Sequence, residues 1–462
     1  MSEKQDGLSV ARNIKIAFFH LGSGMSDVLT TGVWNRIMIS DLGVSATPVS
    51  LLVSLRYFLA PLGLWAGRMS DDHRVLGFRR LAWVWFGRLL MVLSTFGLGF
   101  GTVELMQGSA GVALNPWLII VLSLVLFSLG NALSGSTFLA LIYDRSTEVQ
   151  RGRAVGIVWT FLLLGFTVGG IVFSILLPRD ETLAGFSFAP ADLLRMFVIA
   201  GSLFFSFWFF SLLGEERRNA SATITPVPDA PQHTIKSDVK LVWRTPAMRY
   251  FLFYLTLSMF FAFSQDPILE PFAGDVFDMD ASTTNRFAAY WGGASILASL
   301  GSLWLLRQRN TWTHTRLSQM GVAILLVTFA LFTLVAFVQL EALIMPGLIT
   351  LGVGLGFWNI GTLGLMMDMS PIGRAGTFLG FWSMSVTFAR GGGIASGGIV
   401  RDVALFFSGD LAVAYGVVFG GAFLGLLVAQ WFLQRIAVDE YKVTQQLTES
   451  EDMATVLANA MD

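Results

Sequence analysis

The chain has 462 residues, of which 54% are hydrophobic and 13% are charged, and its mean hydropathy is +0.66. Soluble domains carry about 25% charged residues, so this composition indicates an integral membrane protein and excludes an ordinary soluble domain. The net charge of −1 gives no indication of nucleic-acid binding. The chain has no cysteine, which excludes disulfides and cysteine-ligated metals.

A membrane-crossing helix needs about 20 largely apolar residues. In chain order, six such stretches lie near 14–39, 47–67, 81–104, 116–143, 153–178 and 192–214. A polar segment from Glu215 to about Pro246 follows, and six further stretches lie near 248–272, 286–306, 315–340, 343–367, 376–400 and 411–435. The pattern predicts an all-α membrane protein with twelve transmembrane helices in two six-helix halves. The predicted parts are an N-terminal half (1–214), a linker (215–247), a C-terminal half (248–436) and a tail (437–462).

The distribution of basic residues predicts the orientation, because cytoplasmic loops carry an excess of Lys and Arg. The polar start "MSEKQDGLSVARNIK" has no small-residue cleavage site, so we interpret it as a cytosolic lead-in to the first span. With both termini and the linker in the cytoplasm, most of the thirty basic residues fall on that side. The exceptions are Arg179, Arg195, Arg286 and Arg401 on the other side, and Arg36, Arg56, Arg88 and Arg390 within spans. We therefore expect a multi-pass membrane protein with both termini in the cytoplasm.

The two halves also resemble each other in sequence. "RGRAVGIVWTFLLLGFTVGGIV" (151–172) and "GRAGTFLGFWSMSVTFARGGGIASGGIV" (373–400) both contain Gly-Arg-Ala at the start and end on Gly-Gly-Ile-Val. Asp144 and Asp368 precede them at comparable distances. Chance similarity between glycine-rich membrane helices is the simpler alternative. The preferred interpretation is a duplicated six-helix unit, as in transporters whose pseudo-symmetric halves face a midplane cavity.

The joint between spans two and three, "GRMSDDHRVLGFRR" (67–80), is unusually rich in charge. It resembles the G-x-x-x-D-[RK]-x-G-[RK]-[RK] signature of the major facilitator superfamily, although here two residues separate Asp71 from the next arginine. The resemblance implies that Gly67 lets helix ends approach closely, and that Asp71 meets a helix dipole or an arginine of the facing half. With Arg74, Arg79 and Arg80 these residues would form a cytoplasmic latch that opens in one conformation. A plain positively charged loop is the alternative.

Four further segments carry a closer resemblance. "NRIMISDLGV" (35–44), "SDDHRVLGFRR" (70–80), "QDPILEPFAGDVF" (265–277) and "GGIVRDV" (397–403) are similar to the signatures of the bacteriochlorophyll delivery (PucC/LhaA) family of the major facilitator superfamily. Pro267 is a variant, since the family more usually reads Gln-Asp-Ile-Leu-Leu-Glu-Pro. The resemblance implies a non-enzymatic protein of the photosynthetic membrane. Such a protein would bind or hand over bacteriochlorophyll or a related tetrapyrrole, or chaperone the light-harvesting antenna apoproteins that receive it.

Ionisable residues inside spans are the first candidates for a binding site, because each costs about 2.5–3.5 kcal/mol at midspan. Asp266 and Glu270 are four residues apart and share one face of span seven. Spans one and seven are equivalent in the two halves, so Asp27 is expected to face the same cavity. Permanent ion pairs that only fix helix packing are the alternative. The candidate pigment- or substrate-binding residues are His20, Asp27, Arg56, Gln265, Asp266, Glu270, Asn359 and Arg390.

The magnesium of a chlorin accepts a fifth ligand from nitrogen or oxygen, and His20 is the only histidine inside a predicted span. Gln265 and Asn359 are weaker alternatives. No catalytic constellation, metal-binding spacing or phosphate-binding loop is found, so we expect no enzyme, no resident metal and no intrinsic cofactor. Bacteriochlorophyll remains a candidate cargo, and membrane lipid an expected surrounding partner. A proton-coupled transporter of a small amphiphile and a structural subunit of a photosynthetic complex remain open.

Overall fold

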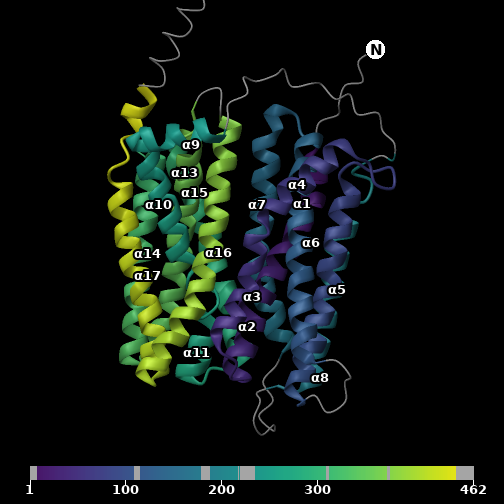
Figure 1. Ribbon diagram of the computed structural model, residues 1–462, viewed down its shortest axis with the longest axis vertical. Coiled ribbons are helices and arrows are strands. Elements are labelled where there is room, and N and C mark those ends of the chain that lie inside the picture. Colours follow the sequence, from purple (N-terminus) through teal and green to yellow (C-terminus); the bar gives the residue numbers. More distant parts are fainter. Residues whose placement is uncertain are drawn as a thin grey trace, which may run out of the picture.

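The computed structural model describes residues 8–108, 115–177, 188–216, 218, 235–308, 312–371 and 375–443. Within these ranges the regular structure is helical, apart from a single bridge between Val75 and Phe78. The helices form two upright bundles that stand side by side (Figure 1). We call the end at which α1 begins and α9 lies the linker face, and the opposite end the far face.

The first bundle contains residues up to Phe210. Its first span is α1 (Val10–Val28), two π-helical segments η1 (Leu29–Val33) and η2 (Ile37–Asp41), and α2 (Trp34–Arg36) between them. The second span is broken at Leu59, where Pro61 in the first turn of the next helix cannot donate a backbone hydrogen bond. The remaining helices are α3 (Ala46–Phe58), α4 (Ala60–Asp72), α5 (Leu81–Met106), α6 (Pro116–Arg145), α7 (Glu148–Leu176) and α8 (Pro190–Phe210).

The second bundle follows a short helix, α9 (Ile235–Arg244), inside the predicted linker. Its first span is interrupted between α10 (Pro246–Phe263) and α11 (Leu269–Phe277), around Pro267. The remaining helices are α12 (Ala281–Asn285), α13 (Phe287–Gln308), α14 (His314–Val338), η3 (Glu341–Leu343), α15 (Ile344–Asp368), α16 (Ala375–Ser408) and α17 (Leu411–Leu433).

Each of the twelve predicted spans coincides with a helical segment of the described chain, and the predicted all-α architecture is confirmed. Ten of these segments are long and apolar enough to cross a membrane by length and composition alone. The other two are the first span and α16, whose sequences are more polar. Both contribute charged groups between the bundles, Asp27 from the first span and Arg390 from α16. The boundaries of the linker and tail stay predictions, because residues 219–234 and 444–462 lie outside the described residues.

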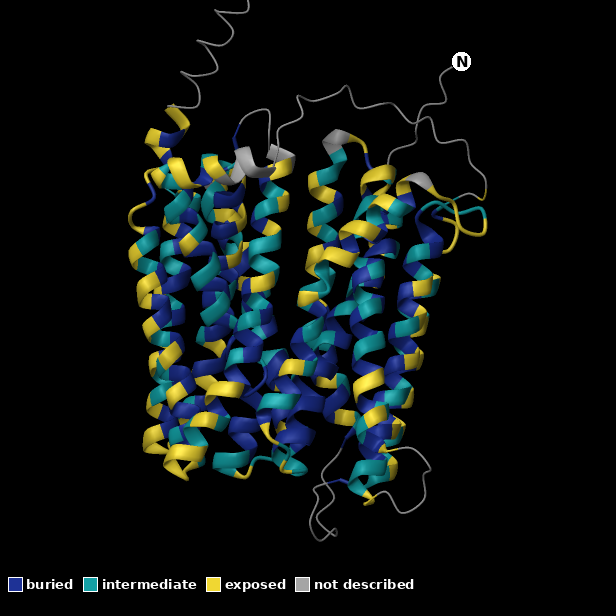
Figure 2. Ribbon diagram, in the orientation of Figure 1, coloured by how far each residue is buried: buried dark blue, intermediate teal, exposed yellow. Residues whose placement is uncertain are grey.

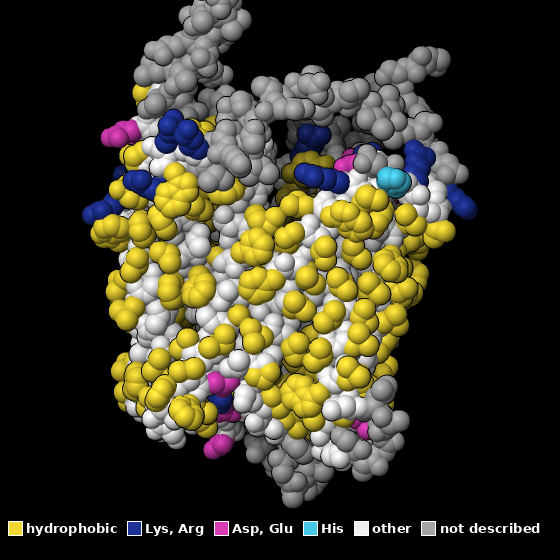
Figure 3. All heavy atoms as spheres, viewed as in Figure 1, with side chains coloured by type: hydrophobic (Ala, Val, Ile, Leu, Met, Phe, Trp, Pro, Cys, Tyr) yellow, Lys and Arg dark blue, Asp and Glu magenta, His cyan; other side chains and the backbone are white. Residues whose placement is uncertain are grey.

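Each bundle has its own core, with Trp34 and Trp208 fully buried in the first and Trp382 and Tyr415 in the second. Buried residues also continue from one bundle to the other near the far face, whereas exposed residues alternate along the linker-face halves of the helices (Figure 2). Hydrophobic side chains cover the outer wall, and basic side chains gather near the linker face (Figure 3). This distribution is typical of a protein that spans a membrane.

Candidate functional site

Four ionisable side chains meet between the bundles, about midway along the first span. Asp27 of α1 binds Arg56 of α3, with 2.5 Å between Oδ1 and Nη1. From the second bundle, Arg390 of α16 lies with Nη2 3.3 Å from Asp266 Oδ2 and 3.7 Å from Asp27 Oδ2. We call these four residues the midplane cluster. The structure thus brings together four of the eight predicted site residues, from both halves of the chain.

Aromatic rings support both guanidinium groups of the midplane cluster. The Arg390 guanidinium carbon is 4.2 Å from the centre of the Phe263 ring and 5.2 Å from that of Tyr57. The Arg56 guanidinium carbon also lies near Tyr57, 5.1 Å from the centre of its ring. Cation–π contacts contribute about 0.5–2 kcal/mol each, more where water is excluded. Two arginines balance two aspartates, so the cluster is neutral as a whole.

Two polar residues of the seventh span flank the cluster. Gln265 donates a hydrogen bond from Nε2 to Asp266 Oδ1 at 2.7 Å. Glu270, in the first turn of α11, is buried and faces Gly32 of η1, where an added Cβ would lie 3.3 Å from Glu270 Oε1. No ion pair or hydrogen bond from another described residue reaches its carboxyl group. Glu270 is therefore a buried acid at a contact between the two halves without a charged partner.

His20 lies on the same face of α1 as Asp27, two helical turns nearer the linker face. Its ring packs 4.8 Å from the Phe138 ring and 6.1 Å from the Trp159 ring, measured between centroids. Its Nδ1 is enclosed without a hydrogen-bond partner, while the residue as a whole is only partly buried. The accessible edge of the imidazole is therefore the one that carries Nε2.

The position of Trp159 shows what this edge faces. Trp159 and Phe166 are seven residues apart on one face of α7, and the Phe166 ring is 5.3 Å from Trp291 of α13 in the other bundle. The Trp159 face of α7 is thus directed toward the second bundle. His20 and Trp159 therefore line the space between the bundles, above the midplane cluster on the linker side.

The two bundles pack tightly on the far side of the cluster. A Cβ added to Gly398 of α16 would lie 2.5 Å from the Ala46 carbonyl oxygen of α3. One added to Gly170 of α7 would lie 2.8 Å from the Ala289 backbone nitrogen of α13. Such positions hold glycine because only glycine lets the helices approach so closely. This packing closes the space between the bundles toward the far face.

The same helices separate toward the linker face. After the break at Leu59, α4 leaves α16 and packs on α6, where a Cβ on Gly63 would lie 2.9 Å from the Ala132 carbonyl oxygen. Gly380, on the corresponding part of α16, has no neighbour within 4 Å of an added Cβ. The molecular surface is hollowed between the bundles at this end (Figure 3). We call this space, open to the linker face and floored by the midplane cluster, the vestibule.

The predicted cytoplasmic latch lies at the linker face, entirely within the first half. Asp71 binds Arg79, with 2.9 Å between Oδ1 and Nη2, and also binds Arg80. Arg80 in addition binds Asp144 Oδ2 at 3.1 Å. Asp71 therefore pairs with arginines of its own half instead of an arginine of the facing half. Arg74 lies in the joint between α4 and α5.

The expected role of Gly67 was wrong. A Cβ on Gly67 would lie 3.8 Å from Ser136 Cβ, which is ordinary van der Waals contact, so close approach does not require glycine there. Gly63, one turn earlier, is the position at which α4 and α6 come too close for a side chain. The Gly67 carbonyl oxygen instead accepts a hydrogen bond from Arg80 Nη1 at 3.3 Å.

The second half has an equivalent arrangement at Asp368. Its Oδ2 lies 2.8 Å from His314 Nδ1, and its Oδ1 accepts a hydrogen bond from Lys442 Nζ at 2.7 Å. The neighbouring Tyr441 is buried, and burial raises the pKa of its phenol to about 12. The beginning of the tail therefore docks on the second bundle. Asp144 and Asp368, paired by their positions in the sequence, also serve equivalent structural roles.

Some features escaped the sequence prediction. Arg88 of α5 is buried between the rings of Phe19 and Trp208, 4.4 and 4.7 Å from their centres. Arg36 donates to the Met279 carbonyl oxygen across the halves at 2.8 Å. Both arginines were visible inside spans, but their partners are distant in sequence. Asn359, which was predicted, is exposed on α15 and takes no part in the midplane cluster.

Comparison with known protein families shows to which family the chain belongs. The family described as PUCC protein matches residues 33–441, which is most of the chain. The chain belongs to the PUCC protein family. Its membership agrees with the four sequence segments named above and with the two-bundle fold.

Two curated relatives of this PUCC-family chain have names that refer to PucC or to bacteriochlorophyll. Protein PucC of Rhodovulum sulfidophilum is 28% identical over 402 residues, which cover 86% of each chain. A protein of Rhodobacter capsulatus named bacteriochlorophyll synthase 44.5 kDa chain is 30% identical over 426 residues, covering 90% of this chain and 92% of that protein. These relatives indicate a photosynthesis-related membrane protein.

Solved structures confirm the major facilitator fold of the PUCC-family chain. A bacterial homologue of the human lysosomal transporter Spinster, in an inward-facing and unoccupied conformation, matches with a TM-score of 0.70 and 13% identity, over 95% of this chain and 99% of that one. A D-xylose–proton symporter matches with a TM-score of 0.66 and 12% identity, over 92% and 97% of the two chains. At these identities the likeness shows the fold alone.

Proposed function

We propose that the protein is a non-enzymatic assembly factor that receives bacteriochlorophyll or a related tetrapyrrole in its vestibule and delivers it to light-harvesting antenna apoproteins. The observation that carries the proposal is the vestibule itself: an accessible imidazole edge and aromatic rings stand above a neutral cluster of four charges. The family membership and the names of the relatives support the same cargo.

The residues of the vestibule suit a flat, magnesium-containing macrocycle. His20 would supply the axial nitrogen ligand from Nε2, and the exposed Trp159 would contact the macrocycle, while the buried Phe138 would hold the imidazole in place from behind. Arg56 and Arg390 would donate hydrogen bonds to carbonyl groups at the ring periphery. Because the two arginines are already neutralised by Asp27 and Asp266, a neutral pigment could enter without burying an unpaired charge.

We further propose that the linker face is cytoplasmic, in the photosynthetic inner membrane. Basic residues at this face, among them Lys15 and Arg79, support that orientation by the positive-inside rule. The vestibule would then open toward the compartment in which both chain termini and the linker lie.

An absorbance spectrum of the protein purified from a phototrophic membrane tests the proposal. We expect bacteriochlorophyll bands at a fixed molar ratio to protein. His20→Leu should abolish them, because the aliphatic side chain keeps the volume but removes the ligand. His314→Leu, a matched change outside the vestibule, should leave them in place. Absence of pigment from the unaltered protein, or equal pigment in the His20→Leu variant, would remove the proposed site.

Glu270 favours a second candidate function, proton-coupled transport of a small amphiphile. A buried acid without a partner at a contact between the halves can bind a proton when the contact closes and release it when water enters. Proton release from detergent-solubilised protein, followed with a pH-indicator dye as a candidate amphiphile is added, measures this coupling. Glu270→Gln should abolish the release and Asp439→Asn, exposed in the tail, should not. A pigment-free protein with this behaviour would favour transport over delivery, and recovery at a fixed ratio with antenna subunits would favour a structural subunit.

A further inference from the structure

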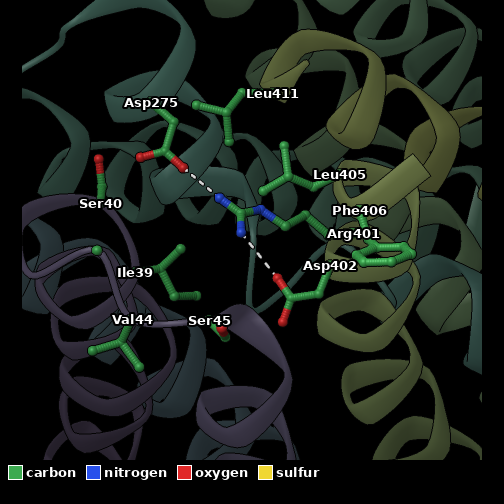
Figure 4. A pocket seen from close by; sticks show the side chains of 11 residues that line it. Ile39, Ser40, Val44, Ser45, Asp275, Arg401, Asp402, Leu405, Phe406 and Leu411 are labelled. Atoms are coloured by element: carbon green, nitrogen blue, oxygen red, sulfur yellow. Dashed lines mark hydrogen bonds and ion pairs between the residues drawn. The ribbon is translucent and has the colours of Figure 1, made fainter. Parts of the chain in front are cut away.

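A second concave site lies at the far face, on the other side of the membrane-spanning region from the vestibule opening. It is a pocket of about 470 Å³ between the end of η2, the start of α3 and the far ends of α11 and α16. Both halves of the chain contribute to its lining, Ser40 and Val44 from the first and Arg401 and Phe406 from the second (Figure 4). Nothing in the proposed function uses this pocket.

The floor of the pocket is a buried charge network centred on Arg401. Arg401 Nη2 lies 2.9 Å from Asp275 Oδ2, and Nη1 lies 2.9 Å from Asp402 Oδ1. Asp402 also accepts hydrogen bonds from the backbone nitrogens of Ala46 and Thr47, at 3.1 and 2.7 Å. Arg401 and Asp402 are therefore occupied by partners within the protein.

Asp275 has one carboxylate oxygen to spare. Its Oδ2 accepts from Arg401 and from the Tyr415 hydroxyl at 2.5 Å, and no hydrogen bond from the described residues reaches Oδ1. The side chain is more than nine-tenths buried, yet Oδ1 points into the pocket toward Ser40 (Figure 4). This oxygen is therefore available to accept a hydrogen bond from a ligand that enters the pocket.

The residues around the pocket carry an excess of negative charge, which favours a cationic ligand. Two aspartates and one arginine form the floor, and a smaller recess beside it shares Asp275 and adds Asp410. The local excess is therefore negative. The free acceptor is a carboxylate oxygen with a hydroxyl nearby, a pair that matches the several N–H donors of a primary ammonium group.

The rim of the pocket is apolar, which favours a ligand with a hydrocarbon tail. Leu405 and Phe406 form its wall at the end of α16, and the Phe406 side chain is 84% exposed. Helix α16 has 34 residues, about 51 Å at 1.5 Å per residue, which exceeds the hydrocarbon core of about 30 Å. Its end therefore reaches the level of lipid headgroups, where aromatic side chains commonly lie.

We propose that this pocket binds an aminophospholipid, with its primary ammonium group between Asp275 and Ser40 and its acyl chains along Leu405 and Phe406. Because the pocket is lined by both halves, the bound lipid stabilises their contact at the far face. The vestibule then stays open toward the linker face for longer. The lipid thus acts on the conformation of the protein as well as on its anchoring.

Retention of lipid by the full-length protein tests the proposal. The protein is placed in nanodiscs that contain equal amounts of phosphatidylethanolamine and phosphatidylcholine with the same acyl chains, and the lipids kept after release are counted by native mass spectrometry. We expect one retained phosphatidylethanolamine, with a preference of about tenfold over phosphatidylcholine, as one charge-assisted hydrogen bond supplies. The quaternary ammonium of phosphatidylcholine cannot donate that bond.

Two neighbouring phenylalanines provide a matched pair of variants. Phe406 lines the pocket and Phe407 does not, although the two side chains are 84% and 81% exposed. Phe406→Ala should reduce the amount of retained lipid, Ser40→Ala should reduce the preference for phosphatidylethanolamine, and Phe407→Ala should change neither. These variants leave the Arg401 network intact, whereas Asp275→Asn could also disturb folding.

Three results would each overturn the proposal. One is equal retention of the two lipids by the unaltered protein. Another is an equal loss of retained lipid in the Phe406→Ala and Phe407→Ala variants. The third is displacement of the lipid by soluble phosphoethanolamine at equal concentration, which would show that the pocket binds a water-soluble amine instead of a membrane lipid.

Discussion

The same helices behave differently at the two ends of the molecule. On α16, Gly391, Gly398 and Asp402 form a stripe that contacts α3 toward the far face. The stripe continues at the same helical spacing toward the linker face through Gly380 and Thr387, and among the described residues none lies within 4 Å of a Cβ added at Gly380. The packed and the unpacked part of α16 therefore lie on the same face of the helix.

Helix α7 repeats this difference at the second seam. Gly170 packs against α12 and α13, while Gly152 and Gly156 lie exposed with no neighbour within 4 Å of an added Cβ. Small residues on a membrane helix therefore show where another helix can approach. On the α3 side, the break at Leu59, after which α4 packs on α6, decides where one does.

The largest expected effect comes from the midplane cluster, where the packed and unpacked parts meet. Arg390→Gln should lower the free energy of unfolding by about 3 kcal/mol, because it leaves Asp266 without its buried partner. Chemical unfolding in detergent measures the change. Arg307→Gln, at an exposed position near the end of α13, is the control, and an equal loss there would contradict a special role for the cluster.

A pair of glycine variants compares the two parts of α16 directly. Gly398→Leu should cost about 1–3 kcal/mol, because the new side chain overlaps Ser50 and the Ala46 backbone of α3. Gly380→Leu should cost less than about 0.5 kcal/mol, as an exposed substitution does. Thermal unfolding of the two proteins in the same detergent gives the difference. Equal losses would mean that the α16 stripe is packed along its whole length.

Variants of two capping aspartates compare a contact between the halves with a contact inside one half. Asp402 caps α3 of the other half, whereas Asp410 caps its own helix by accepting from Val413. Each change to alanine should cost about 1 kcal/mol. Only Asp402→Ala should also loosen the far-face contact. A single cysteine in place of Ser45, in a chain with no natural cysteine, should then react faster with a membrane-impermeant maleimide.

If both variants react with the maleimide at the rate of the protein that carries only the Ser45→Cys change, the Asp402 cap does not hold the two halves together. A faster rate in both would mean that capping at this face acts through general stability.

The smallest effect is expected at the linker face. Asp71→Asn should change the free energy of unfolding by less than about 1 kcal/mol, because its ion pairs with Arg79 and Arg80 are partly exposed to solvent. Unfolding in detergent at low and high salt measures it, and the difference should shrink at high salt. A loss as large as that of Arg390→Gln would show that Asp71 also acts in another conformation.

Much of the fold was already determined by the sequence. Twelve apolar stretches define twelve spans, since a buried helix must satisfy its own backbone hydrogen bonds and cover about 30 Å of hydrocarbon. Charged residues inside those stretches marked the midplane cluster, because such residues are costly unless they meet partners. The repeat preceded by Asp144 and Asp368 likewise predicted two related halves, and the two aspartates have equivalent ion pairs.

Only the tertiary structure decided the partners of these residues. Asp71 pairs within its own half, Glu270 has no charged partner among the described residues, and Asp275 joins Arg401 across 126 positions of the chain. Hydropathy indicates how deep a residue lies in the membrane. It does not indicate which neighbouring helix the side chain faces. That direction follows from how the two bundles pack, which is a property of all their contacts together.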